Sequence, residues 1–191
     1  MSIQVNTQLE EAANLLKGSI RKIFEKEGLF PFDGDPKLEK RDIIEYERRM
    51  RASSVDKFNA PAYTAAANFY RTAGDRQGRN AAGVVILSLK EGSEPVIKRA
   101  GIRNFDEDDY EVVSEKCGEL CEKFAKEFLN ALAAAGFPQL IVSEAVHHRN
   151  NIPGGVEFSY DQYEEYQLVF HLKALPVMVV DISLAQLPKQ R

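Results

Sequence analysis

The chain has 191 residues, of which 44% are hydrophobic and 28% charged, which is typical of one globular domain. No apolar run approaches the roughly 18 residues that a membrane-spanning helix needs, and the N-terminal segment lacks the basic and apolar regions of a secretory signal. The net charge of −4, without a basic stripe, argues against nucleic acid as a partner. We therefore expect a cytoplasmic protein without a membrane span.

The first predicted element is a helix that begins at a capping box, Thr7-Gln8-Leu9-Glu10, and ends before Gly28. A turn-rich segment follows at 29–36. Residues 37–51 are highly charged with few apolar positions, and we predict a second helix there, either a solvated helix over the core or an arm that docks a partner. The expected organisation is therefore a single domain over residues 1–191, with a charged helical insertion at about 33–58.

The middle of the chain predicts a β-hairpin, with strands at 62–72 and 83–90 joined by residues 73–82. The first strand is ambiguous because its alanines favour a helix, but the clear strand GVVILSL that follows decides for a hairpin. The connection contains GDRQG, whose glycines lack the spacing and the Lys-Ser/Thr of a phosphate-binding loop, so we expect a plain turn. A short helix or strand is expected at 95–100.

Four strand-like segments are predicted after the long helix, at 140–147, 156–160, 165–174 and 177–184. Within 165–174, Leu168 and Phe170 share one face, while Gln167 and Val169 lie on the other, which we expect to be half covered. Short links between neighbouring strands favour a mostly antiparallel sheet. The predicted fold class is α+β, with the long helices packed on one face of that sheet.

The longest predicted helix covers residues 109–135 and carries an apolar stripe at helical spacing. Acidic residues at 106–109 precede its first turn, and Gly136 follows its end. Two of its aromatic residues, Phe124 and Phe128, are expected to face the sheet. The whole stripe consists of Val113, Cys117, Leu120, Cys121, Phe124, Phe128, Leu129 and Leu132.

Cysteine and histidine residues do not predict a metal site in this sequence. Cys117 and Cys121 lie on one helix, where a disulfide is geometrically unfavourable, and we interpret both as small core residues. His147 and His148 are neighbours in a predicted strand, so their side chains point to opposite faces and a surface or interface role is expected. We expect neither a metal nor another cofactor.

An acidic and aromatic patch surrounds Tyr160, Tyr163 and Tyr166. Tyrosine is enriched in protein interfaces, so this segment could contact a partner. An ordinary hairpin with a solvated turn is the alternative.

The polar side of the long helix is the sharpest candidate for function. Glu115, Glu119 and Glu122 are separated by four and three residues, which places them on one helical face. Such carboxylates can act at a phosphoryl site or bind a lysine of a partner. With Lys123 and Lys126 they form a charged surface that, in many proteins, is only solvated.

The same helix resembles the CheC/CheX/FliY-type chemotaxis phosphatase superfamily, in particular its CheX-like members. Their long helix carries a pattern close to G-E-L-x-N, and this chain has Gly118-Glu119-Leu120-Cys121-Glu122, continuing to Asn130-Ala131-Leu132. The first helix after Val5-Asn6, the strand at 83–89 and the closing strands are also similar in position. The resemblance covers most of residues 1–30 and 62–185, but not the charged segment at 37–51.

The resemblance implies a dimer-forming protein that removes phosphate from an aspartyl-phosphate on a response-regulator receiver domain. It assigns Glu119 to the glutamate that binds a receiver lysine. Glu119 and Glu122, the two motif positions, should both face solvent. Glu122 stands where the family has an asparagine that orients the attacking water. A carboxylate at this position would face the anionic phosphoryl group. Two unit charges about 4 Å apart repel by roughly 4 kcal/mol at an effective dielectric near 20, which would slow the phosphatase reaction by about three powers of ten. Lys126 stands where the family has a small residue.

We therefore expect a divergent CheX-like protein that binds a receiver domain or another copy of itself, with weak or absent phosphatase activity. Glu119 and Glu122 are the candidate catalytic residues, and Glu115, Lys123 and Lys126 are the candidate partner-binding residues. Two alternatives remain open. One is an active phosphatase that uses Glu119 and Glu122 in altered roles, and the other is an unrelated ligand-binding or structural module.

Overall fold

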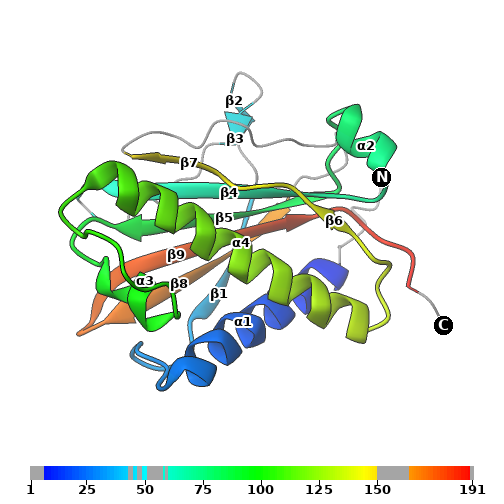
Figure 1. The fold of residues 1–191 in the computed structure, drawn as a ribbon. Coiled ribbons are helices and arrows are strands. Elements are labelled where there is room, and N and C mark those ends of the chain that lie inside the picture. Colours follow the sequence, from blue (N-terminus) through cyan, green and yellow to red (C-terminus); the bar gives the residue numbers. More distant parts are fainter. Residues whose placement is uncertain are drawn as a thin grey trace.

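The computed structural model describes residues 7–42, 45–46, 49–50, 58, 60–149 and 164–189. In this part of the chain, one antiparallel seven-stranded sheet forms the centre of the fold (Figure 1). Its order is β1 (Lys37–Asp42), β8 (Glu164–Leu172), β9 (Leu175–Leu184), β5 (Gly83–Lys90) and β4 (Ala62–Tyr70), and β4 also pairs with β6 (Ile141–Val142) and β7 (Val146–Arg149). A separate pair joins β2 (Glu45–Tyr46) to β3 (Arg49–Met50).

Two long helices, α1 (Thr7–Glu27) and α4 (Tyr110–Ala134), contact each other and lie on one face of the sheet (Figure 1). The short helix α2 (Ala73–Gln77) links β4 to β5, and α3 (Pro95–Arg99) precedes α4. The predicted α+β class, with long helices on one face of a mostly antiparallel sheet, is confirmed. The predicted hairpin is also confirmed, although its connection contains α2, which Thr72 caps by accepting a hydrogen bond from the backbone N–H of Asp75.

Helix α4 begins where its sequence predicts, because Asp109 caps it. The Asp109 carboxylate accepts hydrogen bonds from the backbone N–H groups of Glu111 and Val112 at 3.0 and 3.3 Å. The predicted stripe is buried against the sheet and α1 except for Leu129, which is partly buried. The Phe124 ring lies 6.2 Å from Phe24 and the Phe128 ring 5.7 Å from Phe69. Both aromatic residues are therefore buried, as expected, and Phe128 contacts strand β4 of the sheet, whereas the ring contact of Phe124 is with α1.

The two cysteines are core residues, as predicted. Both thiols are free and fully buried, and Cys121 Sγ lies 3.7 Å from the carbonyl oxygens of Ala65 and Val85. Burial raises the pKa of Cys121 to about 12, and the pKa of Cys117 is raised well above its usual value for the same reason. Both thiols are therefore protonated and unreactive at neutral pH.

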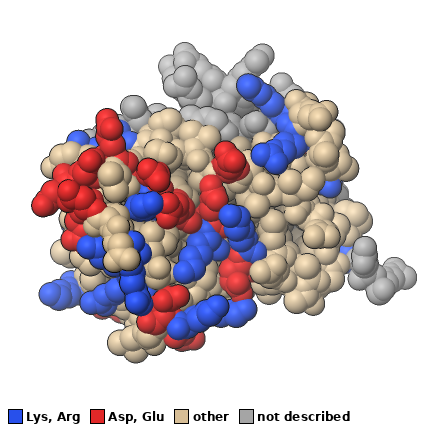
Figure 2. All heavy atoms as spheres, in the orientation of Figure 1, with Lys and Arg blue, Asp and Glu red and all other residues tan. Residues whose placement is uncertain are grey.

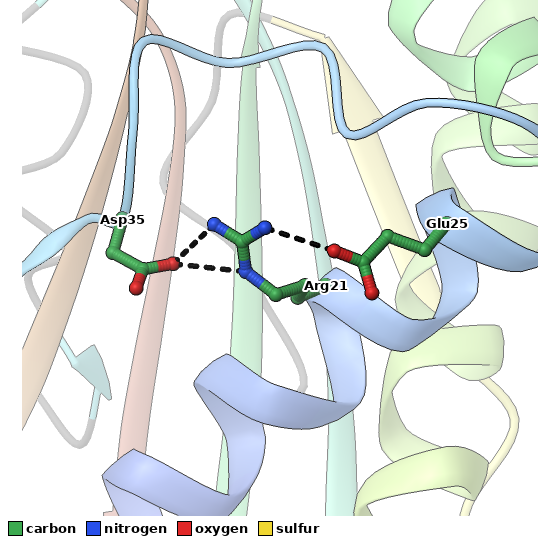
Figure 3. Close-up of polar contacts among 3 residues, drawn as sticks. All are labelled: Arg21, Glu25 and Asp35. Atoms are coloured by element: carbon green, nitrogen blue, oxygen red, sulfur yellow. Dashed lines mark hydrogen bonds and ion pairs between the residues drawn. The ribbon is translucent and has the colours of Figure 1, made fainter.

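The segment between α1 and β1 is fixed by Arg21. Its guanidinium lies between two carboxylates, 2.6 Å from Asp35 and 2.9 Å from Glu25 (Figure 3), and packs over the Phe30 ring at 4.0 Å. This arrangement holds the chain as it turns from the helix layer into the edge of the sheet.

The predicted charged helix at 37–51 is wrong, because the described residues of this segment form strands. β1 pairs with β8 over its whole length, and Leu38 packs against the core while Lys40 forms an ion pair with Glu164 at 2.8 Å. Lysine, arginine and glutamate favour helices locally, but pairing with β8 overrides that preference. A charged sequence is typical of edge strands, because it opposes pairing with other chains.

The closing strands agree with the sequence in outline. The predicted strand at 140–147 is divided into β6 and β7, and the segment at 156–160 lies outside the described residues. The segment at 95–100 is helical. The face of β8 that carries Gln167 and Val169 was expected to be half covered, but both side chains are buried, at 0% and 5% exposed.

Candidate functional site

The exposed side of α4 is a ridge that we define by Glu115, Glu119, Glu122 and Lys126. These residues lie opposite the buried stripe of the helix, so the predicted common face is present. Their side-chain exposures are 60%, 46%, 27% and 63% in that order. Figure 2 shows acidic side chains gathered near the N-terminal end of α4 and both charge signs mixed along its middle. The ridge is thus a continuous charged surface.

Glu119 is accessible but already has a cation from its own helix. Lys116 Nζ lies 2.5 Å from Glu119 Oε1 and 3.4 Å from Glu115. The hydrogen bond to Glu119 raises the pKa of the Lys116 ammonium. A partner cation would therefore bind Glu119 in competition with, or beside, Lys116.

Glu122 differs from Glu119 because both of its carboxylate oxygens are engaged. Oε1 accepts a hydrogen bond from the backbone N–H of Ala145 at 2.9 Å, and Oε2 lies 3.1 Å from Lys126 Nζ. Glu122 thus lies on the exposed side of α4, as expected, but its carboxylate is held by these two contacts. Glu122 holds the segment between β6 and β7 against α4, a contact between residues 23 positions apart that the spacing within the helix could not indicate.

The two candidate lysines are separated in the structure. Lys126 lies on the ridge with Glu122, whereas Lys123 points toward α3 and α1. The Lys123 ammonium donates to the carbonyl oxygen of Ala100 at 2.5 Å and lies 3.9 Å from Glu27. Lys123 thus fixes the neighbouring helices and does not join the ridge.

Strand β7 forms the wall beside the ridge. His147 Nδ1 and Ser114 Oγ are 2.9 Å apart, and a Cβ at Gly118 would lie 3.3 Å from His147 Cδ2. The glycine of the motif therefore permits close approach of β7 to α4. Sequence reasoning missed this contact, and a glycine inside a strong helix was the one signal for it.

A groove of about 790 Å³ lies between the first turns of α4 and β7. Arg149, one of the residues that line it, forms an ion pair with Glu91 at 3.0 Å and packs over the Tyr110 ring at 3.6 Å. Nearby, the Tyr63 hydroxyl is buried, and burial, followed by the charges of Glu94 and Glu91, raises its pKa to about 12. The groove is lined by Asp109, Tyr110, Glu111, Val112, Ser114, Glu115, His147, His148 and Arg149.

Within the described ranges, no group of three or more His, Cys, Asp or Glu side chains could hold a metal ion. No helix of the described residues is long and apolar enough to cross a membrane.

No protein-family model and no curated sequence matches this chain. Several solved structures, however, are similar to it. A chemotaxis protein of Desulfovibrio vulgaris Hildenborough matches with a TM-score of 0.54 and 9% identity, over 90% of this chain and 95% of that one. FliY of Thermotoga maritima matches with a TM-score of 0.54 and 11% identity, over 97% and 91%.

A third similar structure is CheX of Borrelia burgdorferi, solved in a complex with CheY, BeF3 and Mg²⁺. It matches with a TM-score of 0.52 and 11% identity, over 92% of this chain and 98% of that one. These similarities extend over at least 90% of this chain and 91% of each matched chain, although the sequences are only 9–11% identical. The chain therefore has the fold of the CheX, CheC-like and FliY chemotaxis proteins.

Proposed function

We propose that this protein is a divergent CheX-like signalling protein of chemotaxis that binds a response-regulator receiver domain through the α4 ridge. The observation that carries the proposal is the exposed carboxylate of Glu119, in a Gly-Glu-Leu sequence on the long helix of a CheX-type fold. The similarity to a CheX solved with CheY supports a receiver as the partner. The cytoplasm is the expected location.

We infer that phosphatase activity is weak or absent because Glu122 is poorly suited to orient water. An asparagine amide offers both a donor and an acceptor, whereas a carboxylate only accepts and repels the phosphoryl group. The contacts of Glu122 with Ala145 and Lys126 also occupy its oxygens. The rival proposal, an active phosphatase, requires Glu122 to leave these contacts, and a ligand-binding module would use the groove beside β7 instead.

A homodimer through a sheet edge or face is part of the same proposal. The charged side chains of edge strand β1 oppose such pairing, so the proposed contact is the opposite edge of the described sheet, which is formed by the short strands β6 and β7. Light scattering at micromolar concentration tests the assembly directly. We expect a dimer, and a monomer over the whole concentration range would contradict this part of the proposal.

The proposed function is tested with a panel of receiver domains, each measured with and without phosphorylation. We expect the protein to bind at least one phosphorylated receiver and to release phosphate from it no faster than the receiver does alone. Phosphate release well above that rate would favour the active phosphatase. Absence of binding to every receiver would overturn receiver recognition and favour the ligand-binding or structural alternative.

A further inference from the structure

Another pocket, which we call the α3 pocket, lies at the end of the sheet where β5 leads into α3, and its volume is about 370 Å³. Its walls come from the end of β5 and the turn after it, from α3, from the segment after α1 and from the end of the β8–β9 hairpin. These elements lie together at one end of the sheet (Figure 1). None of the residues that define the α4 ridge lines this pocket.

Hydrogen bonds of the backbone fix the walls of the α3 pocket. The Asp33 N–H donates to the carbonyl oxygen of His171 at 2.9 Å, and the Asp33 carboxylate accepts from the N–H of Ala174 at 2.7 Å. These two bonds hold the segment after α1 against the β8–β9 hairpin. Between β5 and α3, the Ser93 N–H donates to the carbonyl oxygen of Lys90 at 3.0 Å and closes the turn. The pocket is therefore preformed, as sites for small molecules usually are.

The inner lining of the α3 pocket is apolar. Pro31, Val96 and Val177 are buried, and Leu172 is partly buried and packs against the core. A ligand with an apolar body would remove further apolar surface from water by packing against these side chains. The lining therefore favours a ligand that is at least partly hydrocarbon.

Two cations line the same pocket. Lys90, at the end of β5, is half-buried, and Arg99, at the end of α3, is exposed. Neither has a carboxylate partner among the described residues. Glu91 is the one carboxylate of the lining, and Arg149 donates to both of its oxygens, at 3.1 Å to Oε1 and 3.0 Å to Oε2. The pocket thus has an excess of positive charge.

We propose that the α3 pocket binds a small organic anion, namely a carboxylate with an apolar body of about six to eight carbon atoms. Lys90 and Arg99 bind the carboxylate, because ammonium and guanidinium groups form charge-assisted hydrogen bonds with it. The hydrocarbon chain packs against the apolar lining. The groove between α4 and β7 is unsuited to this ligand, since Asp109, Glu111 and Glu115 line it and repel an anion. The site is independent of receiver recognition by the ridge.

The experiment is an NMR titration of the isotope-labelled full chain with sodium octanoate. We expect saturable shifts of the backbone amide signals of residues 90–96, with a dissociation constant on the order of 1 mM, because a ligand of this size binds weakly even when it fits well. Octanamide keeps the chain without the charge, and acetate keeps the charge without the chain. Each should bind at least about tenfold more weakly than octanoate.

Variants of the two cations test the recognition of the carboxylate. Lys90→Gln should raise the dissociation constant for octanoate about tenfold, and Arg99→Gln about threefold, because Arg99 is more exposed to water. Lys90→Arg keeps the charge and should stay within about threefold of the wild type. Arg71→Gln is the matched control, because Arg71 is an exposed cation at the other end of the β4–β5 hairpin, and its affinity should equal that of the wild type.

Absence of saturable shifts at residues 90–96 up to about 10 mM octanoate would overturn the proposal. Equal affinity for octanamide and octanoate would overturn it as well, because the cations would then play no part. If the spectrum of Lys90→Gln shows that this variant does not fold, Arg99→Gln decides in its place. An affinity of Arg99→Gln equal to that of the wild type and of Arg71→Gln would then contradict the proposal.

Discussion

The two faces of the sheet are both buried, but they are filled by different chemistry. The face under α1 and α4 carries apolar side chains such as Leu87 and Val180, whereas the opposite face buries polar ones, including Gln167 and Asp181, beside apolar ones such as Val179. Burial of an apolar side chain stabilises the fold whatever its orientation, because the hydrophobic effect is not directional. A buried polar group stabilises the fold only when its hydrogen-bond partners are in place. The helix-covered face should therefore tolerate changes of pH, and the opposite face should depend on hydrogen bonds and protonation.

Removal of an aromatic side chain from the helix-covered face should have the largest effect. Phe124→Ala leaves a cavity between α4, α1 and the sheet, and we expect a loss of about 3–5 kcal/mol in the free energy of unfolding, measured by urea denaturation. Lys126→Ala, on the exposed ridge of the same helix, is the control and should change it by less than about 0.5 kcal/mol. Equal effects of the two changes would show that α4 does not pack as described.

The opposite face should respond to the loss of one hydrogen-bonding group. Gln167→Leu keeps an apolar body of similar size but removes the bonds to Asp181 and Arg41. We expect a loss of about 1–3 kcal/mol in the free energy of unfolding, because a buried carboxyl loses its donor. An unchanged or higher stability would mean that this face behaves like the apolar one, and the contrast between the faces would fail.

The difference between the faces also explains how much of the fold could be predicted. Helical spacing identified the buried side of α4, and a continuous apolar run identified β5, because apolar burial leaves a periodic pattern. The charged segment at 37–51 was misassigned because β1 obtains its stability from pairing with β8, which no local pattern records. The burial of Glu165 and Asp181 was equally invisible, since acidic residues normally indicate exposed positions.

The candidate site, like the fold, could be predicted only in part from the sequence. The ridge and the exposure of Glu119 follow from spacing within one helix. The contacts that fix the ridge, from Glu122 to Ala145 and from Ser114 to His147, join residues far apart in sequence and required the structure.

Glu122 offers a smaller test, on the ridge itself. Glu122→Asn shortens the side chain and should lose the bond to Ala145, at a cost of about 1 kcal/mol in the free energy of unfolding. Glu122→Gln keeps both the length and the acceptor, so its stability should lie close to that of the wild type. If the two variants are equally stable in urea denaturation, Glu122 does not hold the β6–β7 segment.

The contact between Gly118 and His147 should give the smallest effect. Alanine in a helix interior is about 1 kcal/mol better than glycine, but here its Cβ would press on His147. We expect Gly118→Ala to stabilise the protein by about 0.5–1 kcal/mol more in a His147→Ala background than in the wild type. Additive effects in this double-mutant cycle would show that β7 does not restrict position 118.

The central claim, recognition of a receiver through the α4 ridge, is tested most directly by the dissociation constant of Glu119→Gln for the receiver that the wild type binds. Loss of one charge-assisted contact should weaken binding about tenfold. Glu11→Gln is the matched control, because Glu11 is similarly exposed and pairs with Lys189 on another surface, and its binding should equal that of the wild type. An unchanged dissociation constant for Glu119→Gln would contradict the claim.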